Sequence, residues 1–527
     1  MVSAGELRGM LADGRELALL DVREEGAFAR GHLLVAACLP LSHLELRLAA
    51  LVPRRDARVV LCDDDEALAG RAAAAMHRFG YTDIAVLQGG VGAWQAAGFE
   101  LFSGVNVPSK AFGEHVEHGC ATPRISAAEL KAKIDAGEDL VVLDSRPMAE
   151  YRVMSIPGAH DCPGAELVYR VHEAVKRPET LVVVNCAGRT RSIIGAQSLI
   201  NAGLPNRVVA LENGTMGWRL AGFALERGST RHAPPPGDAA LAAARAAAAR
   251  VAERFGVRTI SPAELDRMRQ DPARTLYCFD VRSPEEYRDG HLAGFASAPG
   301  GQLVQATDLY AAVRNARIVL ADADGVRSTM TASWLLQMGW PEVYALEVMP
   351  ARARLARGAE APQVLGLADA RPDEIDPPAL QRLLEATAAT VVDFATSLEY
   401  RDGHIPAAWF AIRARLEDAL ARIGPAQRFV FTSPDGVLAR LAALDAAGLT
   451  KIGVQTLHGG TAAWKIAGFP LERGATRLAA ETDDKYYRPY DRKSGVEQAM
   501  RDYLDWEVAL VESIKREPYL AFRPPAA

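Results

Sequence analysis

The chain repeats one pattern four times along its 527 residues, and this repetition limits its fold more than any other feature. In each copy an apolar segment ends in an aspartate, and a second apolar segment ends in a loop 40 to 42 residues later. The aspartates are Asp21, Asp144, Asp280 and Asp393, and the loops begin at Cys62, Cys186, Asp322 and Ser433. Such regular spacing predicts four tandem copies of one domain.

A short closing motif ends each copy. Three copies carry a tryptophan there, at Trp94, Trp218 and Trp464, with glycines before it. The third copy has Val348 to Ala353 in this place and no tryptophan. The four loops therefore occupy the same place in one fold, although their residues differ.

The apolar segments are short and rich in β-branched residues, and they alternate with stretches of helical pattern. This alternation predicts an α/β fold in which each domain has a central parallel sheet flanked by helices. Parallel sheets bind ligands at the C-terminal ends of their strands, where the four loops begin. We expect domains over residues 1–103, 122–228, 256–357 and 370–475, and then a tail over 476–527.

Three joints connect the copies, and the tail follows the last one. Residues 104–123 and the proline-rich residues 358–378 are interpreted as linkers. Residues 234–254 begin with three prolines and then become rich in Ala and Arg, which predicts a connecting helix. The tail has an amphipathic stretch near Val496 to Ile514. Its aromatic residues are expected to dock on a domain or on a second subunit, which makes a homodimer an open alternative.

Composition narrows the class of function. A net charge of −6 without basic runs gives no argument for a nucleic-acid partner. No apolar stretch has membrane-spanning length and no leader segment is visible, so no membrane partner is expected. Six cysteines are too few for a disulfide framework, which predicts free thiols in a reducing cytoplasm.

The loop at Cys186 has the residues of an anion-binding nucleophile. A β-branched run, Val182 to Val184, leads to the cysteine, and Gly188, Arg189 and Arg191 follow it before a helical stretch. Inward backbone N–H groups, a helix N-terminus and two guanidinium groups all favour an anionic sulfur. We therefore expect Cys186 to be a thiolate nucleophile.

Together these motifs resemble those of the rhodanese (thiosulfate sulfurtransferase) family. The Asp-x-Arg segment, the Gly-His-aliphatic element, the Cys-x-Gly-Arg-x-Arg-Ser loop and the terminal Gly-Gly-x-x-x-Trp occur in the family's order. The resemblance implies that Cys186 takes a sulfane sulfur from thiosulfate or a related donor as a persulfide. It then passes the sulfur to a thiol or cyanide, without a metal or organic cofactor. The implied substrate-binding residues are Ala187, Gly188, Arg189, Thr190, Arg191 and Ser192.

Individual roles follow from the chemistry of these side chains. Arg189 and Arg191 are the candidates to bind the anionic oxygens of the donor and the departing sulfite. For Arg191, bracing of the loop is an equal alternative, and Ser192 could cap the helix. Structural roles in the sheet and the core are expected for Asp144, Arg146 and Trp218.

The other three loops have lost this chemistry. Cys62 is followed by four acidic residues, which raise the pKa of a thiol and repel anionic donors. Asp322 suits a helix N-terminus but cannot carry a persulfide. Ser433 has neither a thiol nor an arginine beside it. We interpret domains 1, 3 and 4 as inactive copies that build interfaces, shape the entrance to the Cys186 pocket or bind a donor or acceptor.

Two other functions stay open at this point. A cysteine phosphatase or arsenate reductase of this fold has a Cys-x5-Arg loop, whereas four residues separate Cys186 from Arg191, which favours attack on sulfur. A persulfide carrier or scaffold with a protein partner would use the same cysteine. Weaker candidates are a resolving thiol at Cys162 and a zinc site at His115, His118 and Cys120.

Overall fold

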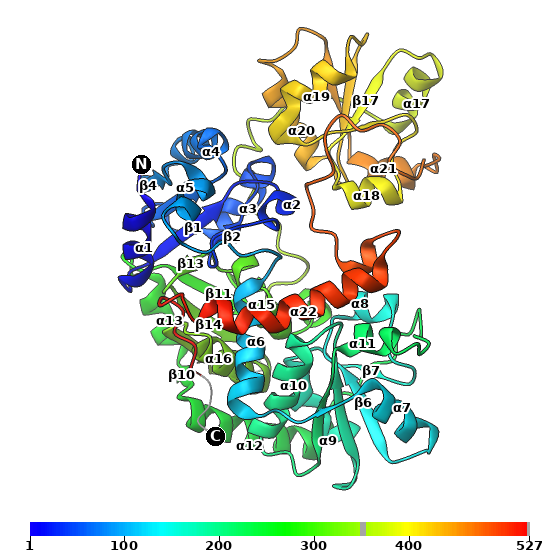
Figure 1. Ribbon diagram of the computed structural model, residues 1–527. Coiled ribbons are helices and arrows are strands. Elements are labelled where there is room, and N and C mark those ends of the chain that lie inside the picture. Colours follow the sequence, from blue (N-terminus) through cyan, green and yellow to red (C-terminus); the bar gives the residue numbers. More distant parts are fainter. Residues whose placement is uncertain (348–354, 524–527) are drawn as a thin grey trace. The chain divides into compact units, whose positions relative to one another are not determined.

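The computed structural model describes residues 1–347 and 355–523 (Figure 1). The chain forms two compact units. The first consists of Met1–Ala4, Leu19–Val105 and Pro362–Tyr487, and the second of Gly5–Ala18, Asn106–Ala361 and Arg488–Ala527. Domains 2 and 3 and the tail therefore belong to the second unit. The closing segment predicted for domain 3, Val348 to Ala353, lies outside the described residues.

Strands and helices recur in the same order in each repeat. Domain 1 contains β1 (Leu17–Asp21), β2 (Ala37–Cys38), β3 (Val59–Cys62), β4 (Ile84–Val86), α1 (Ala4–Ala12), α2 (Glu25–Phe28), α3 (Leu44–Leu51), α4 (Ala67–Arg78) and α5 (Gly90–Ala96). Domain 2 contains β5 (Arg124–Ile125), β6 (Leu140–Asp144), β7 (His160–Asp161), β8 (Leu181–Asn185), β9 (Val208–Leu211), α7 (Ala127–Asp135), α8 (Met148–Val153), α9 (Glu166–Ala174), α10 (Thr190–Asn201) and α11 (Gly214–Leu220).

The later repeats follow the same plan. Domain 3 contains β10 (Arg258–Ile260), β11 (Leu276–Asp280), β12 (Ala296–Ser297), β13 (Val313–Arg314), β14 (Arg317–Ala321), β15 (Glu342–Leu346), α13 (Pro262–Arg269), α14 (Pro284–Asp289), α15 (Gly300–Gln305) and α16 (Val326–Gln337). Domain 4 contains β16 (Asp373–Ile375), β17 (Thr390–Asp393), β18 (Trp409–Phe410), β19 (Phe429–Thr432), β20 (Val454–Leu457), α17 (Pro377–Glu385), α18 (Ser397–Asp402), α19 (Leu416–Ile423), α20 (Val437–Ala446) and α21 (Gly460–Ile466). Three further helices are α6 (Val107–Cys120), α12 (Asp238–Phe255) and α22 (Val496–Ile514).

Each domain has its own set of parallel strands, but β13 is not part of the domain 3 sheet and instead pairs antiparallel with Leu17 and Ala18 of β1. In domain 2 the strand order is β5-β9-β8-β6-β7, and all neighbours are parallel. Domains 3 and 4 repeat this order with β10-β15-β14-β11-β12 and β16-β20-β19-β17-β18. In domain 1 strands β4, β3, β1 and β2 take the corresponding places, and a parallel bridge from Val2 to Leu87 replaces the edge strand. The predicted fold class is confirmed.

The central strand β8 explains why the domain 2 sheet is buried on both faces. Its five residues, Leu-Val-Val-Val-Asn, are buried along the whole strand, as a parallel strand with helices on both sides requires. Alternate side chains point to opposite faces. Val182 and Val184 join the core on one face, whereas Val183 joins the core on the other. The strand therefore holds the following residue, Cys186, in a fixed place at the end of the sheet.

Two joints differ in how well the sequence predicts them. The predicted connecting helix is confirmed as α12, whose buried alanines recur every three or four residues and pack against α9 and α16. Residues 104–123 are not a plain linker, because residues 107–120 form helix α6 with a largely buried surface. The predicted tail helix is α22, which crosses α6 and packs against it (Figure 1).

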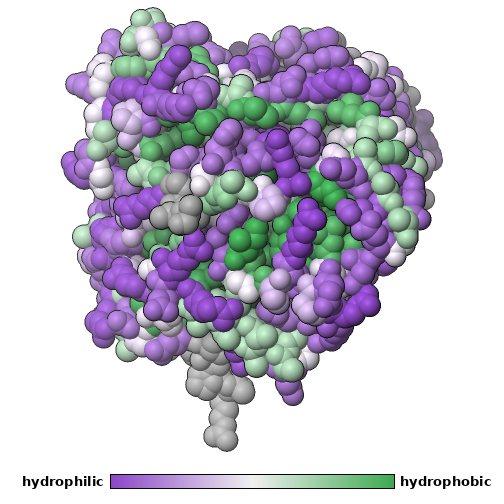
Figure 2. Space-filling view, turned by 60° about the horizontal axis from the view of Figure 1, so that its bottom comes forward, coloured by the Kyte–Doolittle hydropathy of each residue, from purple (hydrophilic) through white to green (hydrophobic). Residues whose placement is uncertain are grey.

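Hydrophilic side chains cover most of the face seen in Figure 2, with smaller hydrophobic areas between them. Within residues 1–347 and 355–523, no helix combines the length and the apolar character that crossing a membrane requires.

Candidate active site at Cys186

Cys186 lies between the end of β8 and the start of α10, at the C-terminal edge of the sheet. Its exposed fraction is 2%, and the loop residues up to Thr190 are buried as well. The Thr215 N–H donates to the carbonyl oxygen of Cys186 at 2.9 Å. A Cβ on the neighbouring Gly214 would lie 2.3 Å from that same oxygen, and this glycine has a φ of +54°. The closing motif therefore needs glycine because it packs directly on the loop.

The protonation of Cys186 differs from the sequence-based expectation. Burial raises the pKa of the Cys186 thiol, although the charge of Arg191 and a hydrogen bond with Ser192 act to lower it. The Cys186 Sγ donates to Ser192 Oγ at 3.5 Å, and Ser192 Oγ donates to the Arg189 carbonyl at 2.7 Å. The expected thiolate is therefore not the favoured resting form. Ser192 is also not the helix cap, because α10 begins at Thr190.

Both loop arginines have carboxylate partners. Arg189 makes two hydrogen bonds of 2.7 Å to Glu114 and a further one to Glu117, both on α6. Arg191 binds the two carboxylate oxygens of Glu150 at 3.0 and 2.8 Å. Burial raises the pKa of Glu150, but the charge and hydrogen bonds of Arg191 outweigh this and lower it to about 2. Donor binding by these arginines stays a prediction.

Sequence reasoning missed the acidic partners on α6. Residues 104–123 mix Gly, Pro and His, and that composition gave no signal of a helix that packs on the loop. The pair of Glu114 with Arg189 spans 75 positions in the chain. The fold brings Glu114 and Arg189 together, and a single sequence does not show which charged residues pair across 75 positions.

The expected bracing pair is present. Arg146 binds both carboxylate oxygens of Asp144 at 2.8 and 2.7 Å, and it also donates to the Met154 carbonyl at 2.6 Å. Asn185, the residue before Cys186, donates to Asp144 at 2.7 Å. Trp218 is buried in the core and donates from Nε1 to the Ala224 carbonyl at 2.9 Å. These contacts hold the C-terminal end of β8, and with it the position of Cys186.

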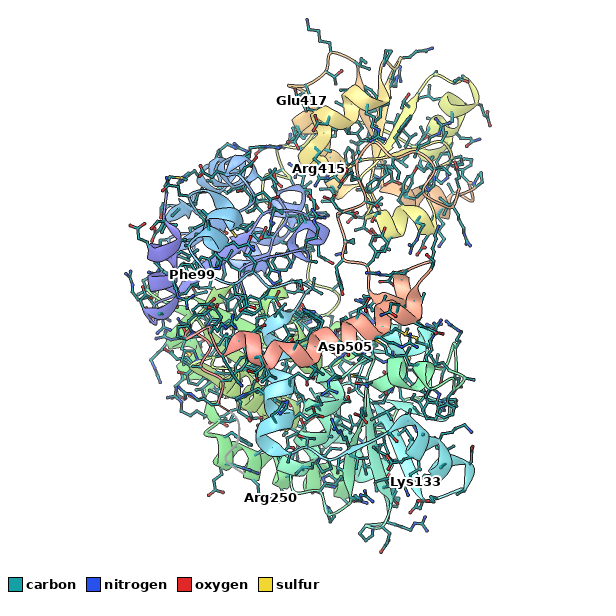
Figure 3. All side chains as sticks on the ribbon, viewed as in Figure 1. Phe99, Lys133, Arg250, Arg415, Glu417 and Asp505 are labelled. Atoms are coloured by element: carbon teal, nitrogen blue, oxygen red, sulfur yellow. The ribbon has the colours of Figure 1, made fainter. Side chains whose placement is uncertain are left out.

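The tail helix α22 covers one side of the Cys186 loop. Ala187 shares a buried apolar cluster with Met500 and Leu504 of α22. A Cβ on Gly188 would lie 3.4 Å from Tyr503 and 2.9 Å from a carboxylate oxygen of Glu507. The tail therefore docks on domain 2. In Figure 3 the helix α22 can be found by the label of Asp505. Close packing of α22 explains why the loop has glycine at position 188.

The loop of domain 3 shows how an anion fits this structure. The Asp322 carboxylate accepts hydrogen bonds from the N–H groups of Gly325, Arg327 and Ser328 at 2.7, 2.8 and 3.1 Å. It also accepts one from the Ser328 hydroxyl at 3.1 Å. By position in the loop, the same donors in domain 2 are the N–H groups of Arg189, Arg191 and Ser192. The loop of domain 3 therefore forms an amide cradle for one negative charge. At the corresponding position in domain 2, Arg189 has φ −118° and ψ −59°, whereas Gly325 has φ +81° and ψ 0°.

The assignment of Cys62 as the start of the domain 1 loop is wrong by one residue. The Cys62 carbonyl accepts from Val22 N–H at 3.0 Å, as the Asn185 carbonyl accepts from Ser145 N–H at 2.8 Å. Cys62 is thus the last residue of a strand, and Asp63 occupies the position of Cys186. The Asp63 carboxylate accepts from the N–H groups of Glu66 and Ala69 at 2.7 and 3.0 Å. In domain 4 Ser433 occupies the same position and accepts from Ala439 N–H at 3.3 Å.

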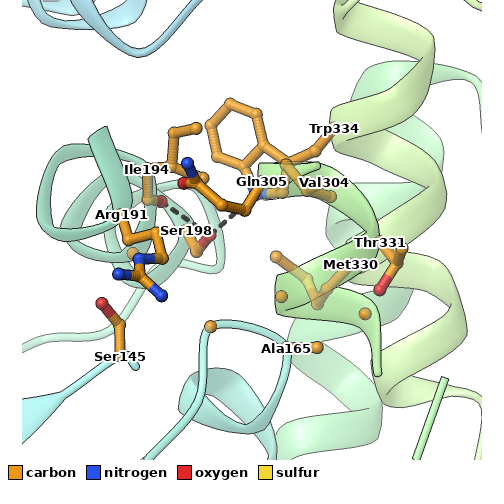
Figure 4. A pocket seen from close by; sticks show the side chains of 14 residues that line it. Ser145, Ala165, Arg191, Ile194, Ser198, Val304, Gln305, Met330, Thr331 and Trp334 are labelled. Atoms are coloured by element: carbon orange, nitrogen blue, oxygen red, sulfur yellow. Dashed lines mark hydrogen bonds between the residues drawn. The ribbon is translucent and has the colours of Figure 1, made fainter. Parts of the chain in front are cut away.

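A cavity lies beside the Cys186 loop, between domains 2 and 3 (Figure 4). The volume that a water-sized molecule can reach in it is about 30 Å³, and its lining includes Arg191 but not Cys186. Arg191 and Ser198 of α10 face it from one side, and Met330 and Trp334 of α16 face it from the other. Trp334 Nε1 donates to Ser198 Oγ at 2.8 Å, which ties the two walls together. Domain 3 therefore contributes a wall next to the loop of domain 2.

The weaker candidates lie apart from this cluster. Cys162 is fully buried in the domain 2 core, and burial raises its pKa well above that of a free thiol. His115, His118 and Cys120 lie on and at the end of α6. Among the residues that the structure describes, no group of three or more His, Cys, Asp or Glu side chains is arranged to hold a metal ion.

Four segments of the chain match the family model of the rhodanese-like domain: residues 3–97, 126–221, 261–348 and 376–467. A solved structure of a thiosulfate sulfurtransferase from Pseudomonas aeruginosa is 48% identical, with a TM-score of 0.96 and 99% of each chain covered.

Two curated proteins match smaller parts. A probable 3-mercaptopyruvate sulfurtransferase from Pseudomonas aeruginosa is 37% identical over 130 residues, which are 24% of this chain and 45% of that protein. A putative sulfur carrier protein from Bacillus subtilis is 31% identical over 107 residues, which are 20% of this chain and 56% of that protein. The chain thus spans about half the length of these two curated relatives. With four matched segments and four sheets of one topology, the chain belongs to the rhodanese family and carries four tandem rhodanese-like domains.

Proposed function

We propose that this protein is a sulfurtransferase that moves a sulfane sulfur from thiosulfate or a related donor to a thiol or cyanide through a persulfide on Cys186. The supporting observation is the amide cradle. Of the four equivalent loop positions, Asp322 and Asp63 hold carboxylates that accept N–H bonds, and Ser433 holds a hydroxyl. Cys186 alone places a sulfur there. The name of the similar thiosulfate sulfurtransferase points to the same activity.

The reaction is a double displacement. The Cys186 thiol loses its proton, and the thiolate attacks the outer sulfur of the donor. In thiosulfate the S–S bond breaks, sulfite leaves with the bonding electrons, and the new S–S bond leaves a persulfide anion on Cys186. The N–H groups of Arg189, Arg191 and Ser192 hold this anion, as their counterparts hold the Asp322 carboxylate. A thiolate or cyanide then attacks the outer sulfur and releases Cys186 as a thiolate.

The substrates that fit are small. The exposed fraction of Cys186 is 2%, and α22 covers one side of its loop, which leaves little access for the folded surface of a partner protein. The cavity between domains 2 and 3 reaches Arg191, and we assign to it the approach of a small donor or acceptor. Arg191 is the arginine placed for an anionic donor, because its guanidinium lines this cavity. Arg189 is enclosed by two carboxylates and has the character of a brace.

Intact-mass analysis after donor challenge tests the proposal directly. Incubation with thiosulfate is expected to add the mass of one sulfur atom, and peptide mapping is expected to place it on Cys186. Cyanide should then remove the added sulfur as thiocyanate. A panel of thiosulfate, 3-mercaptopyruvate and glutathione persulfide, ranked by rate of loading, identifies the preferred donor. Failure of all three to load Cys186 would contradict the proposal.

Filling the cavity should impair sulfur transfer. Val304, on α15, lines the cavity, and a Val304→Phe variant places a larger ring in the space that we assign to the substrate. The larger ring leaves less room for a substrate, so kcat/KM is expected to fall through a higher KM, by roughly tenfold for each ~1.4 kcal/mol of lost binding free energy. The matched control is Val508→Phe on α22, where the valine is 47% exposed. Unchanged kinetics in Val304→Phe with every donor and acceptor would exclude the cavity as a substrate site.

A further inference from the structure

The catalytic loop has a fourth acidic neighbour that the mechanism above does not use. Glu507 of α22 has an exposed fraction of 2%, and its carboxylate lies against the loop. Oε1 accepts hydrogen bonds from the Tyr503 hydroxyl at 3.0 Å and the Thr190 hydroxyl at 3.4 Å. Oε2 lies 2.9 Å from the place that a Cβ on Gly188 would take. No hydrogen-bond partner of this oxygen is found in the described part of the chain.

An ionised carboxylate is costly in this position. A buried polar atom without a partner loses its hydration and gains nothing in return. Burial raises the pKa of Glu507, which makes the neutral acid the easier form to bury. Lys110, Arg189 and the hydrogen bond from Tyr503 act in the opposite direction and lower the pKa of Glu507. Burial and the unpaired oxygen therefore oppose the ionised form, whereas the neighbouring cations favour it.

The charges around Glu507 come from three elements. On α6, Lys110 lies 5.1 Å from the centre of the Tyr503 ring, and Glu114 is fully buried nearby. Burial lowers the pKa of Lys110 to about 8, although Glu507 acts to raise it. On the loop, Arg189 acts on Glu507, and Cys186 is itself affected by Glu507.

Each loop arginine already has a carboxylate partner. Arg189 is bound by Glu114 and Glu117, and Arg191 is bound by Glu150. The charge of Arg191 still acts to lower the pKa of Cys186, but these carboxylates reduce the net positive charge around the loop. The cradle of N–H groups holds one anion, and a second negative charge beside it would oppose that anion. The state of Glu507 consequently decides how much repulsion Cys186 meets when it becomes a thiolate or a persulfide.

We propose that Glu507 is a positioning residue that controls the reactivity of Cys186 through its own charge: neutral, it permits an anionic sulfur in the loop, and ionised, it opposes one. This role matters for sulfur transfer only if Cys186 is the nucleophile, so it rests on the proposed function. It assigns part of the active site to a tail helix more than 300 positions away in the chain, since Thr190 and Glu507 are 317 positions apart.

A thiolate titration tests this role without any sulfur donor. The ultraviolet absorbance of the Cys186 thiolate is followed against pH in the full-length protein, with the matching Cys186→Ser variant subtracted. In Glu507→Gln the neutral amide keeps the shape of the acid but cannot ionise. The pKa of Cys186 is expected to fall by about one unit, since removal of a nearby like charge has effects of this size. Persulfide formation at pH 7 should then become roughly threefold to tenfold faster.

Two further variants separate charge from structure. Tyr503→Phe keeps the ring but removes the hydroxyl that donates to Oε1, so Glu507 stays neutral to a higher pH. It is expected to lower the pKa of Cys186 in the same direction by a smaller amount. Glu512→Gln, on the exposed side of α22, is the matched control and should leave the titration unchanged.

The outcomes distinguish this proposal from the proposed function. A Cys186 pKa in Glu507→Gln that equals or exceeds the wild-type value overturns the role of Glu507, even if sulfur transfer is normal. If Glu507→Gln fails to fold, the Tyr503→Phe titration decides, and an unchanged pKa there overturns the proposal. Absence of a persulfide on wild-type Cys186 overturns the sulfurtransferase function but leaves the thiolate titration valid.

Discussion

Replacement of Cys186 by serine is expected to lower sulfur transfer from thiosulfate to cyanide by at least ~10³-fold, because the reaction passes through a covalent bond to this sulfur. A serine hydroxyl cannot carry the sulfane sulfur, and the other three loops hold Asp63, Asp322 and Ser433 in this position. The measurement is steady-state release of thiocyanate or sulfite by the purified variant.

The matched control for this result is Cys62→Ser in domain 1. Cys62 donates from Sγ to the Leu20 carbonyl at 3.7 Å within a buried strand end, and a serine hydroxyl can make the same bond. Sulfur transfer is expected to be unchanged in this variant. A strong loss in Cys62→Ser, or substantial turnover in Cys186→Ser, would contradict the assignment of the nucleophile.

Replacement of Arg189 by methionine is expected to lower the free energy of unfolding of the unit that contains domains 2 and 3 by about 3–5 kcal/mol. The reason is the state of its partners: Glu114 is fully buried, and Glu117 is largely buried beside it. Loss of the guanidinium leaves the buried Glu114 without a cation, and it leaves Glu117 with Arg124, whose Nη1 lies 3.6 Å from Oε1. Denaturant titration followed by circular dichroism measures the change.

Two comparisons make this result specific. Arg267→Met on α13, an exposed arginine, is expected to change stability by no more than about 0.5 kcal/mol. A Glu114→Gln, Glu117→Gln, Arg189→Met triple variant should recover a large part of the lost stability, because no buried carboxylate is then left unpaired. If Arg189→Met is as stable as the wild type but has a much higher KM for thiosulfate, Arg189 binds the donor and is not a brace.

Much of this structure could be predicted from the sequence because it follows from local patterns that repeat. The spacing between each aspartate and its loop predicted four domains, and the β-branched run before Cys186 predicted the buried strand β8. The pair of Asp144 and Arg146 could be predicted because the two residues are near neighbours on one strand end. The apolar periodicity of residues 496–514 matched the whole of α22.

The errors have a common physical cause, since each depends on contacts between distant segments. Cys62 was matched to Cys186 because both are cysteines. Hydrogen bonds across the sheet instead place Asp63 at the position of Cys186. Helix α6 gains its stability from packing and from the ion pairs of Glu114, which composition does not reveal. The thiolate expectation considered only the charges and N–H groups of the loop and not the burial of Cys186, which raises the pKa of its thiol.

The carboxylate of Asp322 acts as a permanent ligand of its own loop, and this has a consequence for the loop at Cys186. The Asp322 carboxylate occupies the N–H groups of the domain 3 loop at all times, whereas the corresponding N–H groups of domain 2 gain an anion only when sulfur is loaded. Loading should therefore slow amide hydrogen exchange over residues 186–192, leave residues 322–328 unchanged, and raise the melting temperature of this unit. The persulfide would then stabilise the folded enzyme reversibly, so that the melting temperature reports the fraction of the enzyme that is loaded with sulfur.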